Sequence, residues 1–188
     1  GDGDVDVISA SESDDKIAWY ENENGSFSTA NIITTSADGA TSVYTSDPDD
    51  DGDADVFAAS ENDDTISWYE NSEGRFEAGW VISTNADGVQ SVVVADLTGN
   101  GKQDVVSASW HDDKLAWYQG GGGLFGAQQI VSTQARRARS IYADDLDGDG
   151  DADLLSASHQ DDQIAWYENQ EGGFGTARTI TTVAQEAW

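Results

Sequence analysis

Short apolar runs alternate with polar turns along the whole chain. β-Branched and aromatic residues fill the runs, whereas Gly, Asp and Asn fill the gaps between them. This alternation is typical of short β-strands. The central part of the chain shows four such runs: Ser91–Leu97, Asp104–Trp110, Lys114–Tyr118 and Phe125–Thr133. No segment has a sustained apolar period of 3.6 residues, so the pattern predicts an all-β fold.

The same pattern recurs four times at a fixed spacing. A Trp-Tyr dipeptide and a Gly-x-Phe motif both return every 49 residues. The repeated residues are Trp19, Trp68, Trp117 and Trp166, and Phe27, Phe76, Phe125 and Phe174. Four strands in a unit of about 40 to 50 residues are typical of one blade of a β-propeller. The sequence therefore predicts a β-propeller of four-stranded antiparallel blades.

The repeat divides the chain into four units without insertions. Four full units would need eight residues more than the 188 of this chain, and the missing ones match Ser140–Asp147 of the last unit. These residues correspond to the first strand of a blade. Three arrangements remain open: a four-bladed ring, a homodimer that completes a larger ring, or a piece of a longer array. We expect a single array over residues 1–188, with blades at 1–41 (first strand missing), 42–90, 91–139 and 140–188.

The charge of the chain excludes several classes of partner. Its 37 acidic and 8 basic residues give a formal net charge of −29. Binding to nucleic acid or to an anionic membrane requires clustered Lys and Arg, so neither is expected. The absence of Cys excludes disulfides, thiolate metal sites and Cys nucleophiles. No apolar run approaches the roughly 18 residues of a membrane span, so membrane insertion is not expected.

An acidic loop between the first two strands of each unit carries the candidate chemistry. Oxygen-bearing side chains alternate along it, as a hard cation such as Ca²⁺ requires, because Ca²⁺ takes about six to eight oxygen ligands. We expect side-chain ligands at loop positions one, three, five and nine. Position seven should bind through its carbonyl, because Lys102 occupies it in the third unit. The candidate residues are Asp47, Asp49, Asp51, Asp53 and Asp55; Asp96, Thr98, Asn100, Lys102 and Asp104; Asp145, Asp147, Asp149, Asp151 and Asp153; and, in the first unit, Asp2, Asp4 and Asp6.

Calcium suits these loops better than other metals. Mg²⁺ prefers fewer carboxylates and keeps its waters, and Zn²⁺ prefers nitrogen and sulfur ligands. An EF-hand would require Glu at position twelve, where Ala58 and Ser156 stand. We expect three complete sites and a partial fourth, because the first loop lacks positions one and three. Weak sites with a Kd of about 10⁻⁴–10⁻³ M would fill only at extracellular calcium levels, which favours an extracellular setting.

These motifs resemble the FG-GAP/VCBS repeats, the integrin α-subunit-like β-propeller family. The resemblance rests on Asp-x-Asp-x-Asp-Gly-x-x-Asp after an apolar strand, followed by Ser-Ala-Ser, Ile-Ala-Trp-Tyr-Glu-Asn and Gly-x-Phe. It covers the whole chain and implies calcium binding in the acidic loops. It also implies secreted or cell-surface proteins that bind protein or carbohydrate ligands in adhesion, some of them lectins.

Other polar clusters suggest competing functions. Two adjacent Asp residues stand in the second turn of each unit and could act as general acid and base. Because such a pair recurs in every unit, a role in the turns is favoured over a role in an enzyme. Arg136, Arg137 and Arg139 could bind an acidic partner or balance local charge. We therefore expect a recognition module rather than an enzyme, with a structural spacer of a large surface protein and, less favoured, a propeller enzyme as alternatives. The acid pairs are Asp14-Asp15, Asp63-Asp64, Asp112-Asp113 and Asp161-Asp162.

Overall fold

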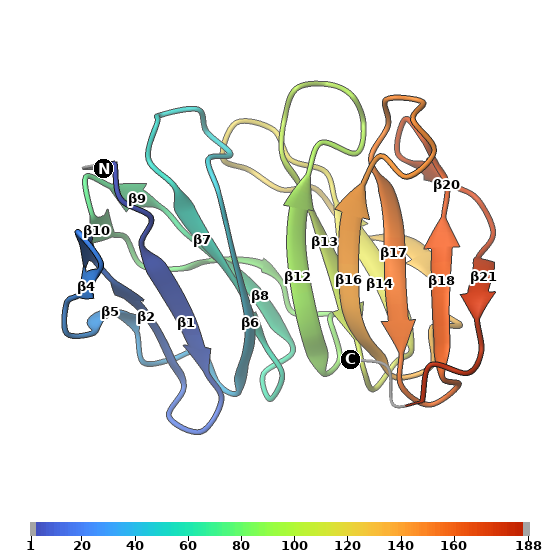
Figure 1. Ribbon diagram of the computed structural model, residues 1–188, viewed down its shortest axis with the longest axis horizontal. Helices are drawn as coiled ribbons and strands as arrows, with labels where there is room; N and C mark the ends of the chain where they lie inside the picture. Colours follow the sequence, from blue (N-terminus) through green and yellow to red (C-terminus); the bar gives the residue numbers. More distant parts are fainter. Residues whose placement is uncertain (1–2, 186–188) are drawn as a thin grey trace.

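Antiparallel β-sheets make up the structure, a computed structural model that describes residues 3–185 (Figure 1). No helix occurs within these residues, so the predicted all-β class is confirmed. One sheet has three strands and three sheets have four. Each four-stranded sheet begins with a strand that precedes an acidic loop, and the next strand begins at the Asp that ends the loop.

The strands follow the same order in every sheet. The first sheet contains β1 (Val7–Ser11), β2 (Lys16–Tyr20) and β5 (Asn31–Thr34). The second contains β6 (Ala40–Ser46), β7 (Asp55–Ser60), β8 (Thr65–Tyr69) and β11 (Trp80–Ser83). The third contains β12 (Val89–Ala95), β13 (Asp104–Ser109), β14 (Lys114–Tyr118) and β15 (Gln129–Ser132). The fourth contains β16 (Ala138–Asp144), β17 (Asp153–Ser158), β18 (Gln163–Tyr167) and β21 (Arg178–Thr181).

Each sheet is accompanied by a small hairpin or bridge. The sequence pattern predicted one continuous outer strand over this hairpin and the true outer strand. The hairpins join the Trp-Tyr strand to the outer strand of the same sheet, and in the third sheet a single bridge between Gly120 and Phe125 takes their place. Each hairpin positions the Phe of the Gly-x-Phe motif. The hairpins are β3–β4 (Asn22–Glu23, Ser26–Phe27), β9–β10 (Asn71–Ser72, Arg75–Phe76) and β19–β20 (Asn169–Gln170, Gly173–Phe174).

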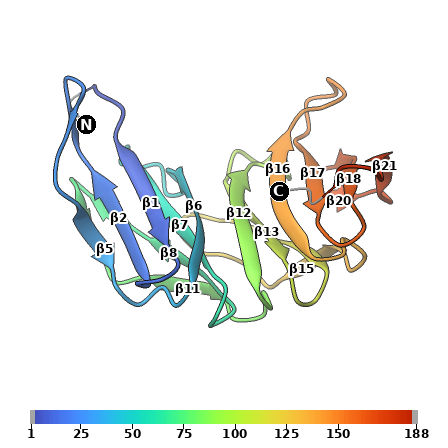
Figure 2. The same ribbon diagram turned by 60° about the horizontal axis from the view of Figure 1, so that its bottom comes forward.

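The four sheets lie side by side like the segments of an open fan (Figure 2). Apolar clusters fill the spaces between successive sheets, because both faces of the Trp-Tyr strand carry large side chains. The sheet with β1 and the sheet with β16 lie at opposite ends of the fan, so the described residues do not form a closed ring. The clusters include Ile17, Val56 and Tyr69; Phe57, Trp68, Val105 and Tyr118; and Trp117, Leu154 and Tyr167.

Burial along the strand that precedes the Trp-Tyr strand in each sheet follows the position of the sheet in the fan. Every residue of β7 and β13 is buried, because a neighbouring sheet covers each of their faces. Strand β1 at one end has no buried residue, and β17 at the other end is only partly buried. The repeat units are therefore alike in local fold, but the two terminal sheets each leave one face uncovered.

Candidate metal centre

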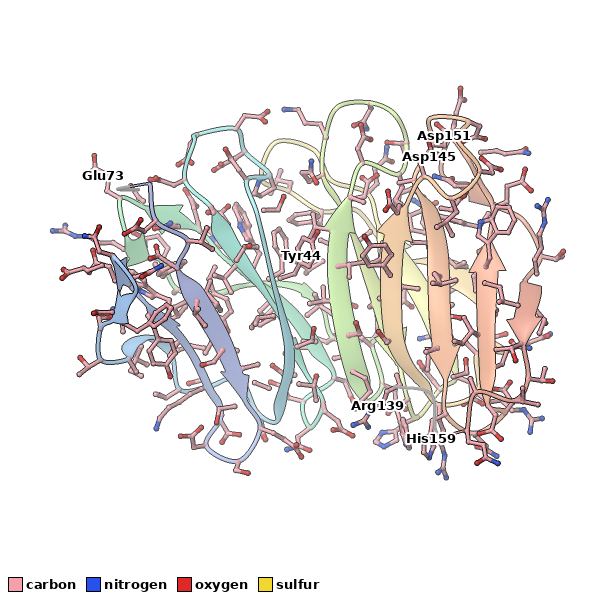
Figure 3. The ribbon with its side chains drawn as sticks, in the orientation of Figure 1. Tyr44, Glu73, Arg139, Asp145, Asp151 and His159 are labelled. Atoms are coloured by element: carbon pink, nitrogen blue, oxygen red, sulfur yellow. The ribbon has the colours of Figure 1, made fainter. Side chains whose placement is uncertain are left out.

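The acidic loops all project from one end of the sheets. Figure 3 shows this for the fourth sheet, where Asp145 and Asp151 lie at one end of the strands and Arg139 and His159 at the other. This arrangement follows from the repeat, because every loop joins the first strand of a sheet to the second. The predicted ligands thus occupy equivalent places in successive sheets.

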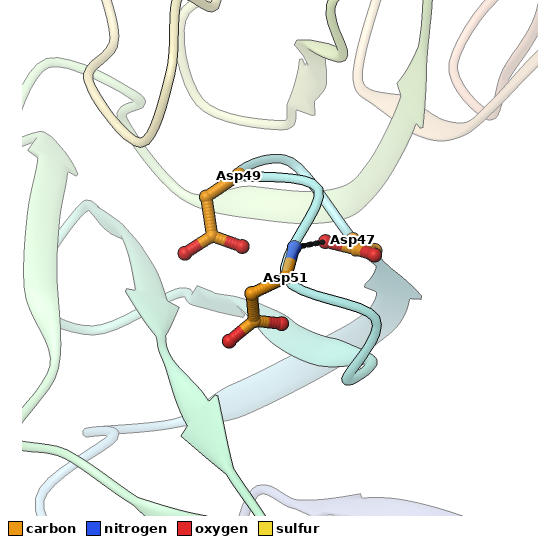
Figure 4. A group of neighbouring side chains, drawn as sticks. All are labelled: Asp47, Asp49 and Asp51. Atoms are coloured by element: carbon orange, nitrogen blue, oxygen red, sulfur yellow. Dashed lines mark hydrogen bonds between the residues drawn. The ribbon is translucent and has the colours of Figure 1, made fainter.

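In the second loop, three predicted ligands converge. The side chains of Asp47, Asp49 and Asp51 each offer a carboxylate oxygen, and these oxygens lie within 4.8 Å of one another (Figure 4). Asp47 holds the loop by accepting hydrogen bonds from the backbone N–H of Asp51 (3.2 Å) and of Gly52 (3.0 Å). One oxygen of Asp49 is buried without a hydrogen-bond partner among the described residues. A cation would supply the partner that this oxygen lacks.

The fourth loop repeats this arrangement. Asp145, Asp147 and Asp149 bring their carboxylate oxygens within 4.8 Å of one another. Asp145 accepts hydrogen bonds from the backbone N–H groups of Asp149 (3.2 Å) and Gly150 (3.1 Å), as Asp47 does in the second loop. Three carboxylates so close together repel each other, and a hard cation relieves this repulsion. The donor set of both loops therefore fits Ca²⁺.

The third loop has the same backbone path with fewer charges. Asp96 accepts hydrogen bonds from the backbone N–H of Asn100 (3.1 Å) and Gly101 (2.7 Å). Thr98 and Asn100 take the places of the second and third carboxylates. Both residues still offer oxygen ligands, but they bring no negative charge, so this loop should bind a cation more weakly than the other two.

The side chain at loop position seven contacts the neighbouring hairpin. Asp53 accepts a hydrogen bond from the backbone N–H of Glu73 (2.7 Å), and Asp151 accepts one from Glu171 (3.2 Å). Lys102, which holds this position in the third loop, instead forms an ion pair with Asp50 at 2.5 Å. Metal binding through the backbone carbonyl of position seven remains a prediction.

The Asp at loop position nine is a buried hydrogen-bond acceptor. Asp55 is 0% exposed and accepts hydrogen bonds from Trp68 Nε1 (2.7 Å) and from the backbone N–H of Asn71 (2.8 Å). Asp104 and Asp153 are equally buried and accept hydrogen bonds from the corresponding backbone N–H groups sixteen residues further on. These bonds fix the hairpin to the loop, a role that the ligand pattern alone did not reveal. A metal contact from position nine remains a prediction.

Burial and like charges raise the pKa values of several loop carboxyls. Burial raises the pKa of Asp55 to about 6. The pKa of Asp49 is also raised, first by burial and then by the negative charge of Asp51. Asp147 is exposed, but desolvation within the loop and then the negative charge of Asp149 also raise its pKa. Without a cation, each of these groups is harder to ionise than a free Asp.

Only part of the first loop can be described. Asp2 lies outside the described residues. Asp4 accepts a hydrogen bond from the backbone N–H of Asn24 (2.8 Å), and Asp6 accepts one from Asn22 (2.8 Å). The two residues thus make the hairpin contacts of positions seven and nine. The structure brings no three acidic side chains of this loop together among the described residues.

The repeated acid pairs serve the turns in which they stand. Asp15, Asp64 and Asp113 have positive φ angles of 57°, 59° and 56°. Asp64 accepts a hydrogen bond from the backbone N–H of Gly88 (2.8 Å), and Asp113 accepts one from Arg137 (2.8 Å). An Asp that adopts the left-handed conformation and accepts backbone hydrogen bonds is typical of a turn.

Two of the three Arg residues singled out in the sequence converge on one indole ring. The guanidinium carbons of Arg137 and Arg139 lie 5.2 Å and 5.4 Å from the centroid of Trp110. The ring of His159 lies 5.1 Å from the same indole. Trp110 directly follows β13 of the third sheet, whereas the Arg and His residues lie at the ends of β16 and β17 of the fourth. This cluster therefore joins the two sheets at the end opposite to the acidic loops.

An Asn that follows the Trp-Tyr dipeptide also joins neighbouring sheets. Asn169 donates from Nδ2 to the carbonyl of Leu97 in the third loop (2.8 Å) and to Ala152 in its own loop (2.9 Å). The Glu-Asn sequence after Trp-Tyr was visible as a repeated motif. Its function was not, because the carbonyl partners lie up to 72 residues away in sequence.

Comparison with known families identifies the repeat. The FG-GAP-like repeat model matches residues 1–57, 47–107 and 96–156. The chain belongs to the FG-GAP-like repeat family. The second and third matches begin at Asp47 and Asp96, the first positions of the acidic loops. No curated protein sequence matches the chain.

Solved structures share the fold of this FG-GAP-like chain at low sequence identity. A chain of the nidogen/laminin complex has a TM-score of 0.65 and 12% identity, over 94% of this chain and 60% of that one. The V. cholerae biofilm matrix protein Bap1 has a TM-score of 0.53 and 17% identity, over 94% of this chain and 28% of that one. The FG-GAP-like chain thus spans less than two thirds of the length of each.

Within residues 3–185, no helix has the length and apolar character needed to cross a membrane.

Proposed function

We propose that the chain is a calcium-stabilised recognition module that binds a protein or carbohydrate ligand outside the cell, in adhesion. Its four sheets would be blades of a β-propeller, with boundaries at 1–41, 42–90, 91–139 and 140–188. The carboxylate clusters of the second and fourth loops are the observation that carries this proposal. The match of these loops to the FG-GAP-like repeat family supports the proposal, because the resemblance to that family implies calcium binding there.

Each proposed calcium site uses side chains at loop positions one, three and five. Calcium would neutralise their mutual repulsion and hold the loop beside the hairpin of the same sheet. Position seven would add its carbonyl, and position nine would support the loop from the buried side. The proposed ligands are Asp47, Asp49, Asp51, Asp53 and Asp55; Asp145, Asp147, Asp149, Asp151 and Asp153; and, in a weaker site, Asp96, Thr98, Asn100, Lys102 and Asp104.

The extracellular setting is supported by calcium chemistry and by the names of the structural relatives. Sites of the weak extracellular type fill only at about millimolar calcium. One relative is part of a complex between two proteins and another is a biofilm matrix protein. By extension from these relatives, we propose a protein as the first class of ligand to test. A carbohydrate, which would make the chain a lectin, is the second.

A panel of immobilised matrix proteins and glycans, probed in millimolar calcium and in EDTA, tests recognition. Saturable binding to a defined ligand that EDTA abolishes is expected. Asp49→Asn should weaken this binding, whereas Glu77→Gln, which removes one exposed carboxylate outside the loops, should not. Folded protein that binds no ligand would contradict the recognition module and favour the structural spacer.

The arrangement of the sheets supports two further points. Uncovered faces at both ends of the fan are consistent with a second chain that completes a ring, so a homodimer is part of this proposal. An enzyme is not favoured, because the repeated acid pairs hold turns and the loop carboxylates recur from sheet to sheet.

A further inference from the structure

A pocket of about 330 Å³ lies between the outer strands of the first and second sheets. The first sheet lines it with β5 and the turn after β5, through Thr34 and Ser36. The second sheet lines it with Thr65 and Tyr69 of β8 and with Gly79, which precedes β11. Among the described residues, none of β1 or β2 lines this pocket.

Two side chains fill the equivalent space between the second and third sheets. The ammonium group of Lys114 donates a hydrogen bond to the carbonyl of Asn85 (2.9 Å) and forms an ion pair with Asp112 (2.6 Å). Gln128 Nε2 donates to the same carbonyl (3.1 Å) and to the hydroxyl of Tyr118 (2.7 Å). Lys114 and Gln128 therefore bridge the two sheets at this place.

The pocket follows from two differences between the second and third repeat units. At the repeat distance of 49 residues, Thr65 holds the place of Lys114 and Gly79 holds that of Gln128. A short hydroxyl side chain and a glycine cannot fill the volume that Lys and Gln fill. The space between the two outer strands is therefore left open by the residues of the second unit.

The turn that supplies the carbonyl is built alike in both places. Ser36 holds the place of Asn85. The backbone N–H of Ser36 donates to Thr34 Oγ1 (3.2 Å), and that of Asn85 donates to Ser83 Oγ in the same way (3.1 Å). The carbonyl of Ser36 is thus the counterpart of the one that accepts the hydrogen bond from Lys114.

A carboxylate is also retained beside the pocket. Asp63 holds the place of Asp112 and belongs to the lining. The hydroxyl of Thr65 donates to Oδ1 of Asp63 (2.7 Å), whereas Lys114 contacts Oδ2 of Asp112, so the two contacts use different oxygens. No Lys or Arg among the described residues lines the pocket. A cation there would meet a carbonyl and a carboxylate, which are strong acceptors for an ammonium group.

We propose that this pocket binds an alkylammonium group, either the Lys side chain of a partner protein or a free diamine. The ammonium group lies between the carbonyl of Ser36 and Asp63, and its alkyl stem packs on the ring of Tyr69. Lys114 shows the occupant that the equivalent space accepts in this chain.

This site goes beyond the recognition function proposed above and does not require calcium. Asp63 stands in the turn between β7 and β8, at the end of the second sheet opposite to its acidic loop. The pocket also lies between two sheets rather than on the uncovered faces at the ends of the fan, so a homodimer would not cover it.

NMR titration of the ¹⁵N-labelled full chain, in EDTA and about 0.15 M salt, tests the proposal. The probes are Nα-acetyl-lysine methylamide and the diamine cadaverine. We expect saturable amide shifts at Thr34, Ser36 and Thr65 with a Kd below about 10 mM. Binding of either probe supports the site, and the tighter of the two identifies the source of the ammonium group. The lysine derivative acetylated at Nζ should not bind, because it carries no charge.

Three variants provide matched tests. Asp63→Asn should weaken binding about fivefold. Thr65→Lys, which supplies the side chain of the third unit, should abolish binding, whereas Thr65→Ser keeps the hydroxyl and should leave it unchanged. The double substitution Lys114→Thr and Gln128→Gly should open a second site, with new shifts at Asn85.

A chain with a net charge of −29 also attracts cations without any defined site. The proposal is therefore overturned by shifts that spread over the acidic loops without saturating, or by shifts that Thr65→Lys leaves unchanged. Equal binding of the Nζ-acetylated derivative would overturn it as well. If Thr65→Lys does not fold, the double variant decides, because a failure to gain a second site would contradict the role of the Lys114 space as a template.

Discussion

The ring of Trp68 meets the ring of Phe125 edge to face, with a centroid distance of 6.0 Å and an interplanar angle of 76°. Trp68 belongs to the second sheet, whereas Phe125 follows the Trp-Tyr strand of the third. Trp117 and Phe174 repeat this contact between the third and fourth sheets, at 6.5 Å and 70°. The two most regular motifs of the sequence thus hold successive sheets together.

Phe125→Ala should lower the free energy of unfolding by about 2 kcal/mol, because it removes a half-buried ring from the contact with Trp68. Urea denaturation followed by fluorescence measures this change. Phe27→Ala provides the control, since Phe27 holds the same place in the first sheet but is 55% exposed. Its cost should stay below about 1 kcal/mol. Equal effects of the two substitutions would contradict the role of the Phe residues between sheets.

Asp55→Ala should cost more than Asp55→Asn. Alanine leaves the indole N–H of Trp68 and the backbone N–H of Asn71 without an acceptor, at a cost of about 3 kcal/mol. Asparagine keeps one acceptor oxygen and should cost about half as much. Urea denaturation in EDTA excludes any effect of calcium. If both variants were as stable as the unchanged chain, Asp55 would not be a structural acceptor.

The raised pKa of Asp55 predicts an unusual pH dependence of stability. Its pKa rises from 3.8 to about 6 on folding, because burial disfavours the charged form. The folded chain therefore binds this proton more tightly than the unfolded chain. The resulting stabilisation is complete below about pH 4 and is lost as the pH rises through about 6.

Denaturation in EDTA between about pH 4 and about pH 6 measures this contribution as the difference between the unchanged chain and Asp55→Asn. The stability of the unchanged chain should fall relative to that of the variant as the pH rises. If the stability of the unchanged chain instead rose relative to that of the variant, Asp55 would ionise more easily in the folded chain than in the unfolded chain.

Gly88→Ala should destabilise the turn between the second and third sheets. Gly88 has a φ of +65°, and an added Cβ would lie 2.6 Å from His111 Nδ1. Gly99→Ala is the control for backbone strain, because Gly99 also has a φ of +65°. No other atom would lie within 4 Å of its added Cβ. The free energy of unfolding should fall by about 1 kcal/mol in the Gly99 variant, and by about 1 kcal/mol more than that in the Gly88 variant. Thermal unfolding that ranks them in reverse order would show that the turn tolerates the extra atom.

The sequence predicted the strands and the acidic loops because both depend on local patterns. Alternation places Val105 and Val106 on opposite faces of one strand, and the loop spacing brings Asp47, Asp49 and Asp51 together. The hairpins were harder to predict, because two-residue strands have no periodicity.

Contacts between sheets could not be predicted from local patterns either. The hydrogen bond from Asn169 to Leu97 spans 72 residues, and the stacking of two Arg residues on Trp110 depends on how the third and fourth sheets meet. A closed ring was one of the predicted arrangements, but closure depends on the angle between successive sheets. That angle depends on side-chain packing that no repeat pattern encodes.

Calorimetric titration of the EDTA-treated chain with calcium tests the central proposal most directly. Calcium should bind saturably at the second and fourth loops and raise the free energy of unfolding by about 1.4–2.7 kcal/mol per site at ten to a hundred times Kd. Asp49→Asn and Asp147→Asn should together remove most of this heat, whereas Glu77→Gln should leave it unchanged. A chain that releases no heat with calcium and unfolds identically in calcium and in EDTA would contradict a calcium-stabilised module.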